Sequence, residues 1–174
     1  MQVRLAETQD AESITALINA AFRAAEAFLI DRDRITLDSV QALQRSGNFL
    51  LGENQVAGSP REDKPDRDAR PEEGAALLGC VYIEVRGERA YLGLLSVDPR
   101  EQRTGVGSAL MNAAEEFCAE AGCRFMDLQL VNLRQELPGF YCRRGYVETG
   151  IAPLPPEIVP KLPCHFVKMS KPLS

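Results

Sequence analysis

Two glycines at the start of a helical segment form the most informative pattern in the sequence. Gly105 and Gly107 close the string Gln102–Gly107, which follows a strand-like segment ending at Val97 and the turn Asp98–Pro99. The first N–H groups of a helix have no partner within the helix and carry the positive end of its dipole, so they bind phosphate groups. Glycine lets a pyrophosphate approach the backbone closely. The segment therefore predicts a phosphate site.

Other families of glycine-rich phosphate loops fit this segment poorly. A P-loop would need a lysine after its last glycine, whereas Gly107 is followed by Ser108 and an alanine. A dinucleotide fingerprint would need a third small residue where Leu110 stands, and only Asp127, about twenty residues on, supports it. A tight strand-to-helix turn that binds nothing is the structural alternative.

Metal and hydrolase chemistry are disfavoured because His165 is the only histidine. No Cys-x-x-Cys pair is present, so no zinc site is expected. A Ser-His-Asp or Cys-His hydrolase would have to use His165, which has no motif around it. The cysteines are expected to be reduced, partly buried thiols: Cys80, Cys118, Cys123, Cys142 and Cys164.

Two further motifs follow the predicted phosphate-binding segment along the chain. Asn132 follows the next predicted strand, and Phe140–Tyr146 reads Phe-Tyr-Cys-Arg-Arg-Gly-Tyr. Together with Val97–Gly107, this order and spacing resembles the GNAT superfamily of acyl-CoA-dependent N-acetyltransferases. The motifs cover roughly residues 92–149, and the order of elements extends the resemblance to the whole chain. It implies an α/β (α+β) fold with a central, mixed, splayed sheet of about 6–7 strands flanked by helices, in a single domain over residues 1–174.

The resemblance also implies acetyl-CoA as acyl donor, without a metal. The pantetheine arm would lie in the gap between two strands, and the pyrophosphate would lie on the glycine string, with Arg100 reaching the ribose phosphate. Asn132 would hold the pantetheine amide, or it caps the next helix instead. The residues implied to contact acetyl-CoA are Leu95, Ser96, Val97, Gln102, Arg103, Thr104, Gly105, Val106, Gly107, Ser108, Asn132 and Tyr141.

The implied reaction is transfer of an acetyl group to a primary amine of a small molecule or peptide, by direct attack in a ternary complex. Acetyl transfer needs a deprotonated amine, donors for the oxyanion and a proton for the thiolate. By resemblance, the Val97 amide is the oxyanion donor and Tyr141 protonates the thiolate, although pure packing is the alternative for Tyr141. Phe140 and Tyr146 are expected in the core. A non-catalytic acyl-CoA sensor or interaction module is the alternative function.

The base and the acceptor are less defined by the sequence. Many family members carry a carboxylate in the strand before the phosphate turn, and Tyr91–Ser96 contains none. Glu84 could act as base through a water, Glu26 could hold a cationic substrate, and His165 has a suitable pKa. A water chain, with all three as ordinary surface or hydrogen-bonded residues, is the alternative. By resemblance the acceptor lies between residues 22–36 and residues 151–163.

The elements that must position these residues follow from hydrophobic periodicity. A helix is expected from a Thr8 cap to Ala25, and a second from Thr36 to Gly47. Residues 57–74 are highly charged and predict a mobile loop. The other expected elements are a short N-terminal strand that ends at Arg4 and Leu5, strands over residues 48–53, 75–85, 89–97, 124–130, 146–149 and 163–169, and helices over 105–121 and 134–144, the latter broken near Pro138.

Composition is typical of a soluble globular protein and disfavours a nucleic-acid-binding or membrane protein. The 174 residues fit one domain at about 100–200 residues per domain, and 45% are hydrophobic. The net charge of −5 and the lack of a basic block disfavour nucleic acid. No apolar run approaches the ~20 residues of a membrane span, and no signal peptide is recognisable, so a cytoplasmic location is expected. The sequence does not decide whether the protein forms a homodimer, in which the last strand could supply the edge where two copies pair.

Overall fold

The computed structural model describes residues 1–54 and 75–174, so the predicted loop at 57–74 lies outside the described residues. The expected order of strands and helices is confirmed. The elements are β1 (Gln2–Leu5), the 3-10 turn η1 (Thr8–Asp10), α1 (Ala11–Glu26), α2 (Leu37–Ser46), β2 (Asn48–Glu53), β3 (Leu77–Arg86), β4 (Arg89–Val97), the 3-10 turn η2 (Pro99–Glu101), α3 (Val106–Glu120), β5 (Phe125–Val131), α4 (Leu137–Cys142), β6 (Val147–Ala152) and β7 (Phe166–Pro172).

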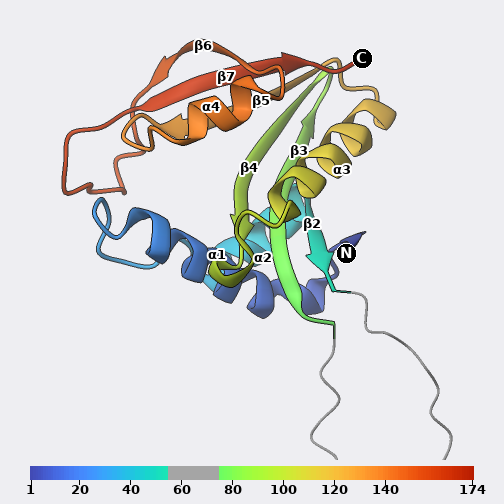
Figure 1. The fold of residues 1–174 in the computed structure, drawn as a ribbon, viewed down its shortest axis with the longest axis horizontal. Helices are drawn as coiled ribbons and strands as arrows, with labels where there is room; N and C mark the ends of the chain where they lie inside the picture. The colour runs from blue at the N-terminus through green and yellow to red at the C-terminus, as the bar shows by residue number, and fades with distance from the viewer. Residues whose placement is uncertain (55–74) are drawn as a thin grey trace, which may run out of the picture.

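The strands form one sheet in the order β1-β2-β3-β4-β5-β7-β6 (Figure 1). Neighbours are antiparallel except β4 and β5, which are parallel. The expectation that the last strand could supply a dimer edge is wrong, because β7 lies between β5 and β6. It pairs with β5 along its whole length, from Phe125 opposite Pro172 to Val131 opposite Phe166. The edge strand at this end of the sheet is β6.

The sheet opens at its centre, which confirms the predicted splay. β4 and β5 pair only through Arg89 with Phe125, Ala90 with Met126 and Tyr91 with Asp127. Beyond these pairs the two strands separate, so Leu92–Val97 of β4 and Leu128–Val131 of β5 are not paired with each other.

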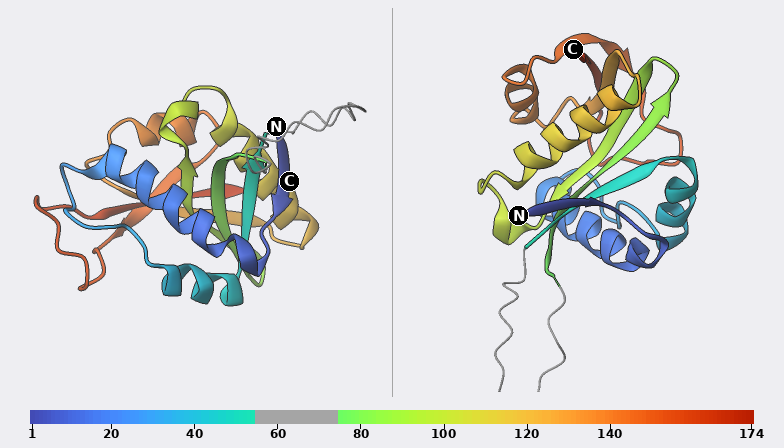
Figure 2. Two further views of the ribbon diagram at one scale, coloured as in Figure 1. Left: turned by 90° about the horizontal axis from the view of Figure 1, so that it is seen from below. Right: turned by 90° about the vertical axis from the view of Figure 1, so that its right-hand side faces the viewer.

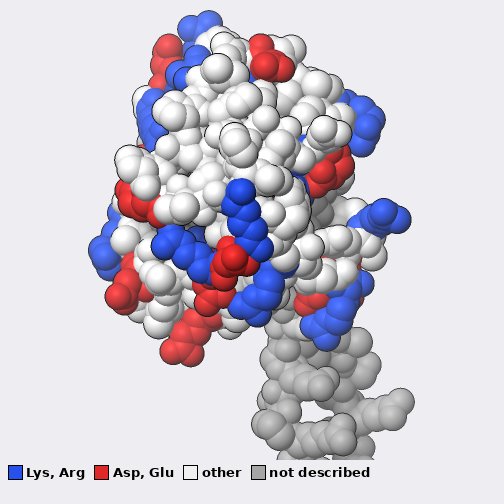
Figure 3. All heavy atoms as spheres, turned by 90° about the vertical axis from the view of Figure 1, so that its left-hand side faces the viewer, with Lys and Arg blue, Asp and Glu red and all other residues white. Residues whose placement is uncertain are grey.

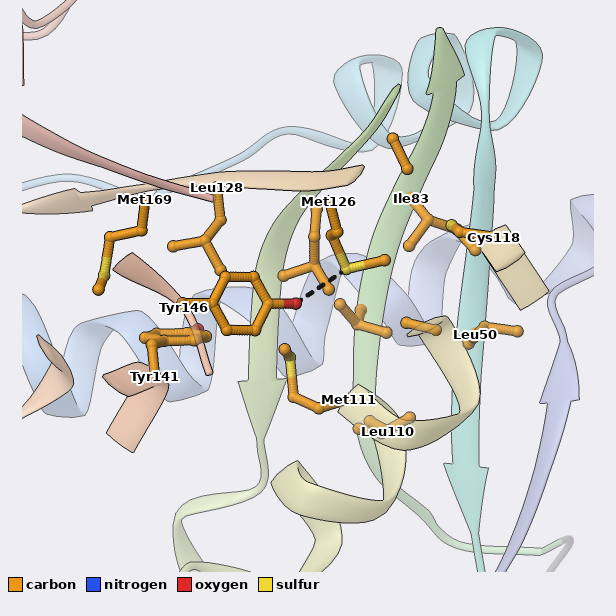
Figure 4. Packing of buried hydrophobic residues seen from close by; sticks show 14 of the residues in the cluster. Leu50, Ile83, Leu110, Met111, Cys118, Met126, Leu128, Tyr141, Tyr146 and Met169 are labelled. Carbon is orange, nitrogen blue, oxygen red and sulfur yellow. Dashed lines mark hydrogen bonds between the residues drawn. The ribbon is translucent and has the colours of Figure 1, made fainter. Parts of the chain in front are cut away.

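Helices cover both faces of the sheet, with α1 and α2 on one side and α3 and α4 on the other (Figure 2). Neighbouring residues of one strand point to opposite faces. In β2, Leu50 packs in the core under α3, whereas Phe49 and Leu51 pack under α1 and α2. The central strands are therefore buried on both faces, and the core under α3 continues to β5 and β7 through Met126, Leu128 and Met169 (Figure 4).

Several element ends differ from expectation. Thr8 begins a 3-10 turn and does not cap α1; Glu7 and Asp10 form a capping box before the helix. Pro138 lies in the first turn of α4 and marks its start, because a proline needs no N–H partner there. The predicted cap of α2 is confirmed, since the N–H of Ser39 donates to the Thr36 hydroxyl at 3.2 Å.

The structure also bears on membrane insertion and on the state of the cysteines. No helix within the described residues combines the length and the apolar character that a membrane span requires. All five cysteines are free, and Cys80, Cys118 and Cys123 are buried.

Candidate active site

A cavity of about 740 Å³ lies where β4 and β5 separate. Residues 92–97 of β4 and 128–131 of β5 form its sides. Tyr141 of α4 borders it from one face of the sheet, and Phe22 and Glu26 of α1 border it from the other. The cavity therefore passes through the sheet, and its volume is in the range of about 300–1,000 Å³ that is usual for small-molecule sites.

A β-bulge distorts β4 beside this cavity. Cys80 of β3 lies opposite Ser96, but Tyr82 lies opposite Gly93, so β4 holds one extra residue. Leu94 takes up the distortion in a left-handed conformation with φ of 53°. Bulges commonly redirect backbone groups next to active sites.

The backbone beyond the bulge presents a free donor to the cavity. The N–H of Asp98 donates to the carbonyl of Leu78 at 2.8 Å, on the β3 side. Because N–H groups alternate in direction along a strand, the N–H of Val97 points the other way, toward β5. The Val97 amide therefore has the orientation that an oxyanion donor in the opening requires.

The glycine string forms a compact turn between β4 and α3. Gly105, with φ of 94°, precedes the first residue of α3, and a Cβ atom there would meet nothing within 4 Å. The Thr104 hydroxyl donates to the carbonyl of Glu101 at 2.6 Å, which holds the turn. The first helical bond runs from the N–H of Ala109 to the carbonyl of Gly105, so the preceding N–H groups of α3 are free for an anion.

Tyr141 reaches the cavity from a buried position. The residue is 5% exposed, and its ring meets that of Tyr146 edge-on at a centroid distance of 5.7 Å (Figure 4). It also meets the ring of Phe140 edge-on, at 5.0 Å. Burial raises the pKa of Tyr141 to about 12, against the opposing effect of Arg134 and Arg144. The phenol is therefore protonated at neutral pH and can donate a proton.

Residues 61–146 match the model of the acetyltransferase (GNAT) family. This stretch includes the bulged strand, the glycine turn before α3 and Tyr141. The chain carries a GNAT acetyltransferase domain. The family and the fold support an acyl-CoA-dependent acyltransferase.

Solved structures with the GNAT fold superpose on nearly the whole chain. The ribosomal-protein-alanine N-acetyltransferase of Brucella melitensis has a TM-score of 0.72 at 15% identity, over 99% of this chain and 100% of that one. Nourseothricin acetyltransferase has a TM-score of 0.66 at 22% identity, over 99% and 98%. At these identities the likeness concerns the fold.

One curated relative also resembles part of the chain in sequence. The uncharacterized protein YdhI of Bacillus subtilis (strain 168) is 28% identical over 97 residues, which is 56% of this chain. The matched part spans 59% of the length of that relative.

Most residues expected to contact acetyl-CoA border the cavity of the GNAT domain. They are Leu95, Ser96, Val97, Gln102, Arg103, Gly105, Gly107, Ser108 and Tyr141. Thr104 and Val106 do not, because the Thr104 hydroxyl is bonded within the turn and Val106 is packed in the core. Arg100, expected at the ribose phosphate, pairs with Asp98 at 2.7 Å.

Asn132 and His165 bond to each other away from the cavity lining. The side-chain oxygen of Asn132 accepts from the backbone N–H of His165 at 2.9 Å, and the Asn132 N–H donates to the His165 carbonyl at 3.0 Å. These bonds join the end of β5 to the segment before β7. The Asn132 side chain therefore does not cap the following helix, whose N-cap is Glu136, and its contact with a pantetheine amide stays a prediction.

Glu84 also lies off the cavity lining. Its carboxylate accepts from Arg86 Nε at 2.9 Å and from the Tyr82 hydroxyl at 3.1 Å. The hydrogen bonds from Arg86 are the main cause that lowers the pKa of Glu84. A carboxylate with a lowered pKa and engaged oxygens is a weak base.

Glu26 does border the cavity, together with a residue that the sequence reasoning missed. Glu26 is buried, and its Oε1 lies 3.1 Å from Nη1 of Arg134, which also bonds to Glu136. The signal that could have identified Arg134 is its place two residues after Asn132, where β5 ends at the opening.

The two segments expected beside the acceptor lie together, as the resemblance implied. The backbone N–H of Lys161 donates to the carbonyl of Leu29 at 2.8 Å, and Arg32 donates to the carbonyl of Glu157. Acidic and basic side chains alternate over the lower half of the face in Figure 3.

Within the described ranges, no three His, Cys, Asp or Glu side chains are grouped as metal ligands.

Proposed function

We propose that this protein transfers an acetyl group from acetyl-CoA to a primary amine, by direct attack in a ternary complex. The observation that carries the proposal is the single cavity that joins three features: the free N–H groups of α3, the bulge of β4 and the buried phenol of Tyr141. These features supply an anion site, an oxyanion donor and a proton donor.

The donor side of the cavity fits an acyl-CoA. The open space at Gly105 and the free N–H groups that follow accommodate a pyrophosphate, and Arg103 adds a positive charge there. The unpaired backbone of β4 between Leu92 and Val97 offers hydrogen bonds to the amides of the pantetheine arm.

In the reaction, the amine nitrogen attacks the thioester carbonyl carbon. A C–N bond forms, the negative charge on oxygen is held by the Val97 N–H, and the C–S bond then breaks. Tyr141 donates its proton to the departing sulfur. The ordinary pKa of a thiol, about 8.5, lies below that of Tyr141, so this proton transfer is uphill and takes place as the C–S bond breaks, after which water returns a proton to the phenolate.

No side-chain base is included in the proposal, because Glu84 and His165 lie off the cavity and Glu26 is paired with Arg134. The amine loses its proton to water. The value of kcat/KM is therefore expected to rise with pH and to level off near the pKa of the acceptor amine itself.

The test begins with calorimetric titration of the protein with acetyl-CoA, desulfo-CoA and NAD. Binding of acetyl-CoA but not NAD, followed by release of CoA thiol when amines are added, supports the proposal. Binding of acetyl-CoA with no transfer to any amine points to an acyl-CoA sensor. Absence of acetyl-CoA binding overturns the assignment of the phosphate turn and the enzyme together.

A further inference from the structure

Arg34 is a cation at the cavity that lacks a carboxylate partner in the described part of the chain. It borders the main cavity and also a smaller pocket of about 260 Å³, which shares Phe22 and Glu26 with it. Nε of Arg34 is buried without a hydrogen-bond partner. A buried donor left unpaired is costly, so such a group often marks a place where a ligand binds.

The carboxylates that line the smaller pocket with Arg34 form ion pairs with other cations. Asp33 lies 2.6 Å from Arg23, and Asp31 lies 2.5 Å from Lys161. At the cavity itself, Glu26 is paired with Arg134. None of these three carboxylates therefore forms an ion pair with Arg34.

The position of Arg34 is held by its neighbours. The side-chain amide of Asn19 bonds to both backbone groups of Ile35, at 2.9 Å to the carbonyl and 3.0 Å to the N–H. The guanidinium of Arg34 lies over the ring of Phe22, 5.1 Å from its centroid. A cation fixed in this way loses little conformational entropy when it binds an anion.

Tyr91 brings a second donor to the same face of the sheet. A Cβ atom on Gly93 would lie 3.0 Å from both Cε1 and the hydroxyl oxygen of Tyr91, so the ring lies over Gly93, next to the bulge at Leu94. Tyr91 borders the cavity. Arg34 borders the same cavity. Burial raises the pKa of Tyr91, and the positive charges of Arg34 and Arg86 oppose this.

We infer that Arg34 and the Tyr91 hydroxyl bind an acidic group of the acceptor, and that the acceptor is a small amine carrying a carboxylate, as in an α-amino acid. This rests on the proposed acetyl transfer. An Arg fork and a phenol donor together match the two oxygens of a carboxylate. The bulge next to Gly93 places this anion site beside the expected point of transfer, as a short separation between amine and carboxylate requires.

The experiment compares the twenty standard α-amino acids with their α-amides as acceptors, using CoA thiol release at fixed acetyl-CoA. The expected result is transfer to acids with much lower kcat/KM for the matched amides. In Arg34→Gln, KM for the best acid should rise by about 10- to 100-fold, because a charge-assisted bond is lost. Tyr91→Phe should raise the same KM by a smaller factor, and neither change should alter the Kd of acetyl-CoA.

Arg45→Gln is the matched control, since it removes an exposed guanidinium from α2, outside the cavity lining. Thermal denaturation of each variant shows whether it is folded. Product binding can be measured directly by calorimetric titration of CoA-loaded protein with N-acetyl amino acids. Arg34→Gln should weaken the binding of these products, and Arg45→Gln should not.

Transfer to amides, to C-terminally amidated dipeptides or to simple amines as efficient as transfer to acids would overturn this inference and leave acetyl transfer standing. An unchanged KM in folded Arg34→Gln would overturn it as well. Failure of acetyl-CoA to bind would instead overturn the proposed function on which it rests.

Discussion

The carboxylate of Glu26, the last residue of α1, lies 3.1 Å from the guanidinium of Arg134, which follows β5. The two side chains are 8% and 15% exposed, so this ion pair is nearly removed from water. It links the α1 face of the sheet to the strand on the far side of the opening. The pair therefore contributes to the width of the cavity at this end.

Replacing Glu26 alone should destabilise the protein strongly. Glu26→Leu leaves the buried guanidinium of Arg134 with only Glu136, and loss of one partner of a buried pair costs about 3–5 kcal/mol. Urea denaturation measures the loss. The double variant with Arg134→Met should recover part of it. Glu88→Leu is the control, because its contact with Arg124, at 3.7 Å, is highly exposed and worth about 0–1 kcal/mol. Equal losses in the two single variants would contradict burial of the Glu26 pair.

Gly105→Glu should abolish acetyl-CoA binding. The new side chain would occupy the space in front of α3 and would repel the phosphates, and the positive φ adds backbone strain. Gly87→Glu is a close control, because Gly87 also has a positive φ and open space around its Cβ, but lies in the turn between β3 and β4. Calorimetry should show lost affinity for Gly105→Glu only, with similar losses of stability. Unchanged affinity would show that the pyrophosphate binds elsewhere.

Tyr141→Phe should lower kcat by about 10²- to 10⁴-fold, the usual contribution of a general acid. The Kd of acetyl-CoA should stay nearly the same, since only the hydroxyl is removed. Tyr146→Phe removes a hydroxyl that bonds to Glu115 at 3.2 Å on the core side, so it should reduce stability with little effect on kcat. Equal effects of the two variants on kcat would indicate that Tyr141 only packs.

The buried tyrosines also predict loss of stability at high pH. Burial raises the pKa of Tyr141 and of Tyr82 to about 12 in the folded state, above their ordinary value of 10.0. The stability from keeping these phenols neutral is complete below pH 10 and is lost as the pH rises toward 12. From pH 8 to 11, the urea midpoint of the protein should fall relative to that of Tyr141→Phe, which lacks this phenol. Parallel curves would contradict the raised pKa.

A cluster of ion pairs near the N-terminus should make stability depend on pH in the acid range as well. Arg4 bonds to Asp10 and Glu53, at 2.8 and 2.7 Å, and its hydrogen bonds lower the pKa of Asp10 below the ordinary 3.8. This contribution is complete above pH 3.8 and is lost as the pH falls through the lowered pKa. Arg4→Gln should therefore be less stable than the parent at neutral pH, with a difference that shrinks below pH 4. A constant difference in urea midpoint would contradict this.

The sequence predicted the elements whose signals are local. The apolar period of α1, the Thr36 cap and the alternation in β5 all depend on residues close in the chain, and each was confirmed. The glycine turn before α3 could also be predicted, because a glycine readily takes the positive φ that Gly105 has at the start of this helix.

The sequence could not show which charges meet across the sheet. Glu26 and Arg134 are 108 residues apart, and Asn132 bonds to His165 over 33 residues, so only tertiary packing determines these partners. Arg34 stands in an alternating Asp-Arg run that reads as a mixed surface, and only the structure shows which of its charges are compensated. The position of β7 inside the sheet likewise follows from long-range pairing.

The three residue pairs that join β4 to β5 have a consequence for hydrogen exchange. The amides of Leu92–Val97 and Leu128–Val131 that face the opening lie in the middle of a seven-stranded sheet, yet they lack a ladder partner there. They should exchange with deuterium as fast as the amides of an edge strand, while those bonded to β3 and β7 stay protected. An acyl-CoA that hydrogen-bonds to this backbone would slow the exchange of the amides it contacts on either strand. The residues whose exchange slows would therefore map the path of the bound pantetheine arm.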